Sequence, residues 1–229
     1  MARGMNHLIA SFRKLTGFRK VAGAAVTAAL LVSVPAAVLV PAVPAAAQQT
    51  SDLDRAVEAL RGISTFQANF TQTDRNGQRL AGVLTIKRPG KMRFQYQPGV
   101  PLLVVADGNA LVLVDYEVRQ VQRWPIKNSP LGALLDPTRD VKKFGTLQPV
   151  SDPDIVSIEI RDRSHPEYGV INLIFARKAG APGGLELVGW VALDSQNQRT
   201  TIRLANQRYG IAVADNMFRY NDPRGTPRR

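Results

Sequence analysis

The sequence predicts a mainly β fold with few helices, in which a curved antiparallel sheet forms an unclosed β-barrel under a helical lid. Apolar or alternating runs of strand length fill residues 82–124, and turn-forming residues separate each run from the next. The alternating runs have one apolar and one polar face, as antiparallel sheets do. Strands follow strands along the rest of the chain and helical segments are few, so the sheet has to curl to cover its own apolar face.

The first 47 residues form a separate segment. An apolar run at 21–47 follows a basic start that contains no acidic residue, and it ends in three alanines at 45–47. The basic residues are Arg3, Arg13, Lys14, Arg19 and Lys20. A basic start, an apolar middle and small residues at the end are typical of a secretory signal peptide. We therefore expect residues 1–47 to be a signal peptide and residues 48–229 to form a single exported domain.

A membrane anchor is the alternative for the first segment, because an apolar run of that length is long enough to span a bilayer. Pro35, Pro41 and Pro44 interrupt the run and argue against an anchor. The basic part is long for a signal peptide, so Met5 is an alternative start of the protein.

The predicted exported domain is moderately basic. The chain has 30 basic and 18 acidic residues, and removal of the basic residues at 1–47 leaves 25 against 18, a net charge near +7. These charges form no stripe interleaved with aromatic residues, so we expect no nucleic acid partner. The chain has no cysteine, hence no disulfide and no attachment site for a lipid anchor. We expect a protein that is released in soluble form into the periplasm.

Residues 51–62 are predicted to form the one long helix. Ser51 is the expected N-cap, and Asp52 and Asp54 follow in the first turn, where carboxylates stabilise the helix dipole. Gly62 ends the segment. Apolar residues repeat at helical spacing, which gives the helix one face to pack on the sheet; they are Leu53, Ala56, Val57 and Leu60.

The pattern predicts about ten or eleven strands. Residues 65–74 and 78–88 are expected to pair across Asn76-Gly77, the strongest hairpin signal in the chain. After the 82–124 stretch, strands are expected at 142–149, 155–162, 169–177, 185–194 and 199–208, with a last short strand at 217–220 before a loosely held tail. Within 185–194, one face is expected to carry Leu185, Leu187, Val191 and Leu193, with Trp190 opposite.

Arg88 is the unusual residue on the apolar face of the sheet. It lies in phase with Leu84 and Ile86, so the strand period directs it inward. Two interpretations are open. It is either an arginine at a strand end that extends to solvent or a donor that hydrogen-bonds backbone carbonyls of the lid. The next strand continues the apolar face with Met92, Phe94 and Tyr96.

Residues 129–136 interrupt the strand pattern. The segment begins with Ser-Pro and Pro137 follows it, so a short helix is predicted. Its apolar side would carry Leu131, Leu134 and Leu135. An ordinary connecting helix and a movable lid over the apolar face are both open interpretations.

The sequence offers no group of residues for catalysis. Residues 48–229 contain a single histidine, His165, in a predicted turn. A metal site needs clustered ligands, and a Ser-His-Asp triad needs a buried histidine. Asp107 and Asp115 lie in predicted turns, where aspartate supports turn geometry. We therefore expect no enzyme activity, no catalytic residue, no cofactor and no metal.

Four stretches of the chain form an ordered set of motifs, G-x-L-x-I-K-R-P-G-K-M-R-F-x-Y-x-P at 82–98, V-A-D-G at 105–108, Q-V at 120–121 and S-P-L-G-A-L-L at 129–135. Further residues near the two ends belong with them, namely Phe66, Phe70, Thr71, Gln72, Gln198, Arg199, Thr200, Leu204, Phe218 and Pro223-Arg224-Gly225. In order and in spacing, over nearly all of residues 52–225, these motifs resemble those of the LolA family of periplasmic lipoprotein carriers.

The resemblance implies a monomeric chaperone that carries acylated lipoproteins from an inner-membrane ABC complex to an outer-membrane acceptor. It implies that Arg88 bonds to the lid, which here would carry Leu131, Leu134 and Leu135. It also implies an apolar cavity for the acyl chains, lined by Met92, Phe94 and Tyr96. We expect Leu84 and Ile86, on the apolar face of the preceding strand, to line the same cavity. Residues 110–113 read Ala-Leu-Val-Leu where many members carry Leu-Trp, which leaves open the shape of the pocket but not its apolar character.

Three alternatives to a lipoprotein carrier are open. A related exported protein of the same fold could bind or sense lipids without delivering lipoproteins. The outer-membrane receptor shares the fold but needs a lipidated cysteine, which this chain lacks. An exported enzyme is the third alternative, and the sequence offers it no catalytic residues.

Overall fold

The computed structural model of the chain describes residues 45–126, 135 and 141–225. Nearly all of the predicted signal peptide lies outside these residues, as do Leu131 and Leu134 of the predicted lid. In the part of the chain that is described, no helix combines the length and the apolar character needed to cross a membrane.

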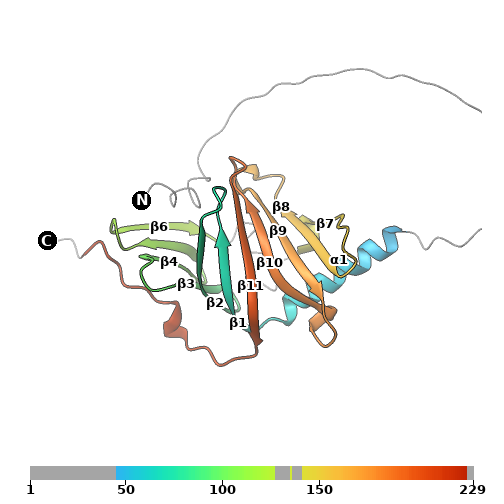
Figure 1. Cartoon of the computed structure of the whole chain (residues 1–229), viewed down its shortest axis with the longest axis horizontal. Helices are drawn as coiled ribbons and strands as arrows, with labels where there is room; N and C mark the ends of the chain where they lie inside the picture. Colours follow the sequence, from blue (N-terminus) through green and yellow to red (C-terminus); the bar gives the residue numbers. More distant parts are fainter. Residues whose placement is uncertain (1–44, 127–134, 136–140, 226–229) are drawn as a thin grey trace, which may run out of the picture.

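Within the described residues, most of the chain forms one antiparallel sheet of 11 strands, in the order β6-β5-β4-β3-β2-β1-β11-β10-β9-β8-β7 (Figure 1). The strands β6 and β7 end this order and are not paired with each other, so the barrel is unclosed and the predicted fold class is confirmed. The strands are β1 (Thr65–Thr73), β2 (Arg79–Lys87), β3 (Lys91–Tyr96), β4 (Leu102–Asp107), β5 (Ala110–Asp115), β6 (Gln120–Pro125), β7 (Gly145–Gln148), β8 (Ile155–Arg161), β9 (Val170–Arg177), β10 (Leu185–Leu193) and β11 (Arg199–Tyr209).

The hairpin predicted at Asn76-Gly77 joins β1 to β2, which pair along their whole length. The carboxylate of Asp74 accepts hydrogen bonds from the backbone N–H groups of Asn76 and Gln78, each at 2.8 Å, and Gly77 has a positive φ of 79°. On its other side β1 pairs with β11, so the first and last strands are neighbours at the middle of the sheet.

The long helix α1 (Ala45–Gly62) begins before the predicted Ser51, which lies inside the helix and is not its N-cap. Residues 45–49 are alanine and glutamine, which both favour helix, so the helix starts there and continues through Thr50 and Ser51. Figure 1 shows α1 beside the β7–β10 half of the sheet, where it contacts β10 and β7. The short helical elements are α3 (Val141–Phe144), which replaces the start of the strand predicted at 142–149, η4 (Pro166–Tyr168), η5 (Pro182–Gly184) and η6 (Asp215–Phe218).

The predicted faces of β10 are wrong beyond Leu187, because the strand contains a bulge. The register with β9 shifts between Leu187 and Gly189. Trp190 consequently lies in the same core cluster as Leu185 and Leu187 rather than opposite them. An extra residue in one strand inverts the alternation of side chains beyond it. The residues moved to the other face are Val191 and Leu193.

The C-terminal segment covers part of the outer face of the sheet. The sequence predicted that one face of this part of the sheet is exposed to solvent. The structure differs, because β4 is buried from Leu102 to Ala106 without alternation. The reason is a second apolar cluster, in which Val213 and Phe218 cover outward side chains of β4 and β5, namely Leu103, Val105, Val112 and Val114. The strand predicted at 217–220 is wrong, because this region forms η6 and an irregular tail.

Candidate functional site

The concave side of the sheet carries the residues predicted to line a cavity. They lie on the neighbouring strands β2 and β3, where Leu84 is opposite Phe94 and Ile86 is opposite Met92. The side chains of all the predicted cavity residues are at most 7% exposed and belong to one apolar cluster. The structure therefore brings together, on one face, Leu84, Ile86, Met92, Phe94 and Tyr96.

Aromatic rings from three strands form the centre of this concave face. Phe70 on β1 lies edge-on to Phe94 and Tyr96 on β3, with ring centroids 5.0 and 5.3 Å apart. Trp190 on β10 also lies edge-on to Phe94, with ring centroids 6.0 Å apart. Gly82 on β2 leaves room for these rings, because a Cβ there would lie 2.8 Å from the ring of Phe70. Edge-to-face packing thus connects the two halves of the sheet across its concave side.

Arg88 follows β2 directly and its side chain is half-buried. Its Nη1 donates a hydrogen bond to the carbonyl oxygen of Leu60 in the last turn of α1. Carbonyls in the last turn of a helix lack a regular helical donor, and the only other described bond to this one is a 3.3 Å contact from the N–H of Ile63. The described bond goes to α1, and the 129–136 segment, in which the prediction placed the partner of Arg88, lies outside the described residues except for Leu135.

Leu135 is the one residue of the predicted lid that the structure describes. Its side chain is completely buried in the core cluster. Its carbonyl oxygen accepts a 2.9 Å hydrogen bond from the backbone N–H of Gly90, in the turn between β2 and β3. Two contacts therefore hold the same end of the β2–β3 hairpin. Arg88 bonds to α1, and Gly90 bonds to Leu135, whose side chain lies in the core.

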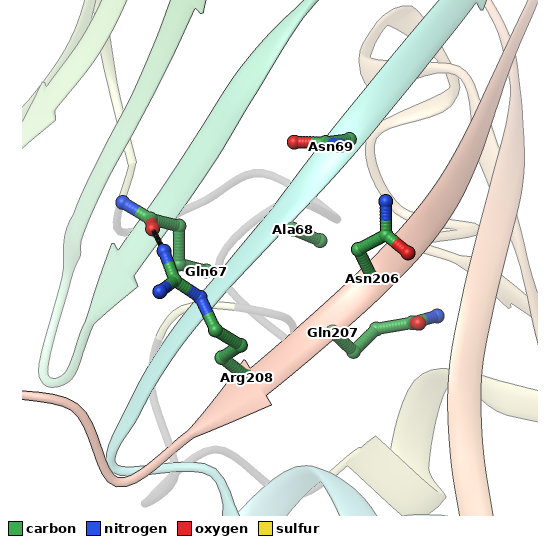
Figure 2. A pocket seen from close by; sticks show the side chains of 6 residues that line it. All are labelled: Gln67, Ala68, Asn69, Asn206, Gln207 and Arg208. Atoms are coloured by element: carbon green, nitrogen blue, oxygen red, sulfur yellow. Dashed lines mark hydrogen bonds between the residues drawn. The ribbon is translucent and has the colours of Figure 1, made fainter.

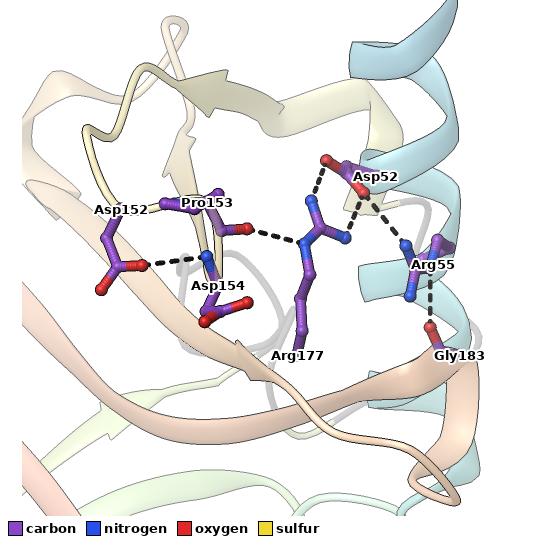
Figure 3. A network of polar contacts seen from close by, with 7 residues as sticks. All are labelled: Asp52, Arg55, Asp152, Pro153, Asp154, Arg177 and Gly183. Carbon is purple, nitrogen blue, oxygen red and sulfur yellow. Dashed lines mark hydrogen bonds and ion pairs between the residues drawn. The ribbon is translucent and has the colours of Figure 1, made fainter.

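A second set of polar contacts holds the middle of α1 (Figure 3). The carboxylate of Asp52 accepts hydrogen bonds from Nη1 and Nη2 of Arg177, at 2.9 and 2.7 Å. Arg55 Nε donates to the carbonyl of Gly183 at 3.0 Å, and Arg177 Nε donates to that of Pro153 at 2.9 Å. The hydrogen bond from Arg177 lowers the pKa of Asp52 below its usual value. This helix is therefore attached to β9 and the adjacent turns near its middle and to the end of β2 in its last turn.

One polar pair interrupts the apolar concave face. The hydroxyl of Tyr96 donates to Oε1 of Gln72 at 2.9 Å, and each side chain is only 5% exposed. Burial raises the pKa of Tyr96, so its hydroxyl stays protonated and acts as the donor. Sequence periodicity placed Gln72 in the first strand but did not identify it as a site residue, because a polar side chain on a strand is expected to face solvent.

A separate hollow of about 400 Å³ lies where β1 and β11 lose register (Figure 2). The shift falls between Gln67 and Asn69, and Asn206 has a positive φ of 55°. Arg208 donates a hydrogen bond to Gln67 across the two strands. The lining is largely polar and consists of Gln67, Ala68, Asn69, Asn206, Gln207 and Arg208. It therefore does not have the apolar character predicted for the cavity.

His165 lies in a turn, and its described contacts are local: its backbone N–H donates to the carbonyl of Asp162, and its side chain meets residues of η4. Its Nδ1 is 2.9 Å from Oε1 of Glu167, and its ring stacks on Tyr168. The hydrogen bond from His165 lowers the pKa of Glu167. Throughout residues 45–126, 135 and 141–225, no group of three or more potential ligands is placed to hold a metal ion.

Comparison with known proteins finds a family model described as outer membrane lipoprotein carrier protein LolA, which matches residues 61–221. The outer-membrane lipoprotein carrier protein of Xanthomonas campestris pv. campestris (strain B100) is 28% identical over 196 residues, which are 80% of this chain and 89% of that relative. The protein of the same name from Dechloromonas aromatica (strain RCB) is 28% identical over 182 residues, with coverage of 76% and 85%.

Among solved structures, a LolA superfamily protein from Nitrosomonas europaea is similar to this chain. The alignment has a TM-score of 0.42 at 12% sequence identity, and it covers 75% of this chain and 97% of the other.

Proposed function

This chain belongs to the LolA family of outer membrane lipoprotein carrier proteins, and from that membership we propose that it is a soluble periplasmic chaperone for lipoproteins. In this proposal it takes acylated lipoproteins from an inner-membrane ABC complex, shields their acyl chains from water, and hands them to an outer-membrane acceptor. The observation that supports the proposal most is the concave face, where apolar side chains of β1, β2, β3 and β10 form one cluster under α1.

Acyl chains need such a container to cross water. Each methylene that leaves water contributes roughly 0.8 kcal/mol, so exposure of one palmitoyl chain costs about 12 kcal/mol. The aromatic and aliphatic residues of the concave face offer apolar contacts along the chain. We assign the acyl-chain site to Leu84, Ile86, Met92, Phe94 and Tyr96.

Arg88 provides the reversible part of the proposed mechanism. Its hydrogen bond to Leu60 holds the end of β2 against the end of α1, and the bond from Gly90 to Leu135 holds the adjacent turn against the predicted lid. We infer that entry of acyl chains separates these elements and that release restores the bonds. A hydrogen bond to a charged group contributes about 1.5–3 kcal/mol. That is small against chain burial, but it is enough to favour onward transfer without ATP.

We also propose that residues 1–47 direct export and are then removed. Residues 48–229 would then act in the periplasm as a monomer, and the absence of cysteine means that they carry no lipid of their own. The proposed role is binding and transport, with no catalytic step, cofactor or metal.

A transfer assay between membranes tests this function. The purified protein is incubated with inner-membrane vesicles that contain the ABC complex and a labelled lipoprotein, and the soluble fraction is then added to outer-membrane vesicles. We expect the label to appear first in a soluble complex and then in the outer-membrane vesicles. Capture without delivery would indicate a lipid-binding relative that does not pass its cargo on, and the absence of capture would contradict the proposal altogether.

A further inference from the structure

We propose that the outer face of the sheet docks on a bilayer that contains anionic phospholipids. The docking surface consists of five exposed arginines on β2, β11 and the β1–β2 turn, and we name it the outer basic face: Arg75, Arg79, Arg199, Arg203 and Arg208. The inference goes beyond the proposed function, because it concerns the side of the sheet opposite the acyl-chain site and needs no cargo.

Charge is unevenly distributed across the sheet. The neighbouring strands β3, β2, β1 and β11 together carry seven lysines and arginines and no aspartate or glutamate. By contrast, β8, β9 and β10 carry two arginines and two glutamates. The sequence contains no run of like charges at this place, because the pairing of β1 with β11 brings distant segments together.

All seven cations of the four strands point outward. Arg203, for example, lies between Ile202 and Leu204, which are both buried in the core on the concave side. The same alternation and the strand register direct the whole set outward, namely Arg79, Lys87, Lys91, Arg93, Arg199, Arg203 and Arg208.

The C-terminal segment occupies three of these cations. Lys87 and Lys91 lie 2.9 and 2.8 Å from the carboxylate of Asp215. Arg93 donates hydrogen bonds of 2.9 and 3.0 Å to backbone carbonyls of the same segment. The arginines of the outer basic face differ, because none of them forms an ion pair with a carboxylate in the part of the chain that is described.

The acidic residues on the strand and turns beside the outer basic face are already engaged. Asp74 in the β1–β2 turn and Asp194 in the β10–β11 turn each accept two hydrogen bonds from backbone N–H groups of their own turn. Glu186 on β10 is paired with Lys178 at 2.6 Å. The positive charge of the outer basic face is therefore available to an external partner.

The polar hollow between β1 and β11 opens on this same face (Figure 2). Gln67 and Asn69 alternate with the buried Ala68, so they point outward. Arg208 and the exposed amide of Asn206 complete a lining that is rich in N–H donors. Such donors suit the phosphate and glycerol oxygens of a lipid headgroup, and the hollow of about 400 Å³ has room for one.

The chemistry of the outer basic face favours a bilayer over a protein partner. Arginine binds phosphate with two parallel hydrogen bonds, and the five guanidinium groups spread over neighbouring strands instead of converging on one point. The buried centre of a protein interface is apolar, whereas Val83 is the one large apolar side chain exposed on the β1, β2 and β11 part of this face within the described residues. Each basic residue at an anionic membrane surface strengthens binding roughly fivefold.

Docking through this face turns the acyl-chain site away from the bilayer. The contact therefore concentrates the protein at the membrane surface without pressing the concave face against lipid. An attraction of this kind is reversible and depends on ionic strength.

Co-sedimentation with lipid vesicles tests the inference. The protein purified from periplasm, without cargo, is mixed with vesicles of phosphatidylcholine and phosphatidylglycerol or with vesicles of phosphatidylcholine alone. We expect binding to the anionic vesicles only. Binding should be lost in about 1 M salt, where the Debye length is about 3 Å.

Paired substitutions assign the binding to the outer basic face. Arg203→Gln with Arg208→Gln should lower the vesicle partition coefficient at least tenfold. Arg79→Gln with Arg199→Gln should act in the same direction and serves as the test if the first pair unfolds. Circular dichroism checks the folding of each variant.

The matched control removes the same charge elsewhere. Arg61 lies in the last turn of α1 and Arg163 in the turn after β8, and both are exposed. Arg61→Gln with Arg163→Gln should change the partition coefficient less than threefold, although the net charge falls equally.

Three results would overturn the inference. The first is no binding to anionic vesicles at low salt, and the second is equal binding to both kinds of vesicle. The third is an equal loss of binding in the control pair, which would make net charge the cause. If the protein instead binds only native inner-membrane vesicles, and protease treatment of those vesicles abolishes binding, the partner is an acidic protein and the inference is wrong.

Discussion

The guanidinium of Arg88, directly after β2, donates a hydrogen bond to the carbonyl oxygen of Leu60 in the last turn of α1. Leu60 is 1% exposed and packs in the core cluster, so this bond lies where the concave face meets the helix that borders it. A charged donor and a helix-end carbonyl form a strong but local contact. Separation of β2 from α1 breaks this bond without disturbing the sheet.

Replacement of Arg88 by leucine is expected to separate loading from delivery. The variant should capture lipoprotein from inner-membrane vesicles at least as well as the wild type, because the bond from Arg88 to Leu60 no longer has to break for cargo to enter. It should deliver poorly to acceptor membranes, because release no longer restores a bond of about 1.5–3 kcal/mol. Both steps are measured with the same labelled lipoprotein.

Arg61→Leu is the matched control for this experiment, since Arg61 is an exposed arginine in the last turn of α1. We expect it to load and deliver like the wild type. If Arg88→Leu instead loads badly and releases its small load at the normal rate, Arg88 is a residue of the binding site or of the folding core, and its proposed role in release is wrong.

A charge on the concave face should abolish capture. Phe94→Glu places a carboxylate among Phe70, Tyr96 and Trp190 with no described cation beside it, and an unpaired buried charge is strongly unfavourable. We expect capture of lipoprotein to fall at least tenfold. Gln95→Glu adds the same charge at the exposed position next to it and should have little effect. Circular dichroism checks that both variants fold, and normal capture by folded Phe94→Glu would rule out this face as the acyl-chain site.

The ion pair between Asp52 and Arg177 should make stability depend on pH. The pKa of Asp52 is lowered in the folded protein from a reference value of 3.8, so the pair stabilises the fold above that value and the effect is lost as the pH falls through the lower folded pKa. The side chain of Asp52 is 16% exposed, and a pair of this kind contributes about 1 kcal/mol. At neutral pH, Asp52→Asn should therefore lower Tm by about 2–4 °C.

Thermal unfolding of the wild type and the variant across pH provides the measurement. The difference in Tm should shrink toward zero as the pH falls through the lowered pKa of Asp52 in the folded protein. Asp54→Asn, at a more exposed position of the same helix, should change Tm less. A difference between Asp52→Asn and the wild type that stays constant over the whole pH range would show that charge pairing is not its cause.

The predicted processing of the N-terminal segment has a direct test. N-terminal sequencing of the protein recovered from periplasm should find a start at or near Gln48, after the alanines at 45–47. Recovery of the intact chain from the membrane fraction would support the anchor interpretation of residues 1–47 instead.

The sheet was predictable where its strands alternate without interruption. In β2 and β3, period-two alternation placed Leu84, Ile86, Met92 and Phe94 on one face, and the structure has them on one face. The same rule failed in β10, because the bulge before Gly189 shifts the phase and moves Trp190 into the core. A glycine inside a strand is a signal for a bulge, but it does not say which residue is the extra one.

Contacts between distant parts of the chain were not predictable from local pattern. The pairing of β1 with β11, the cover that Val213 and Phe218 form over β4, and the choice of Leu60 as a partner of Arg88 all depend on how the sheet curves. Gln72 was missed for a related reason. Its inward direction follows from alternation with Phe70, yet its polarity favours the solvent side, and only the hydroxyl of Tyr96 reveals why it is buried.

The central claim is that acyl chains occupy the concave face, and site-specific photo-cross-linking tests it most directly. A photoreactive phenylalanine analogue replaces Phe94 on the concave face or, as a control, Val191 on the other face of β10. Each protein is loaded from inner-membrane vesicles with a lipoprotein that carries radiolabelled palmitate and is then irradiated. We predict a labelled adduct at position 94 and none at position 191. Adducts at position 191 with none at position 94, or equal adducts at both, would contradict the account.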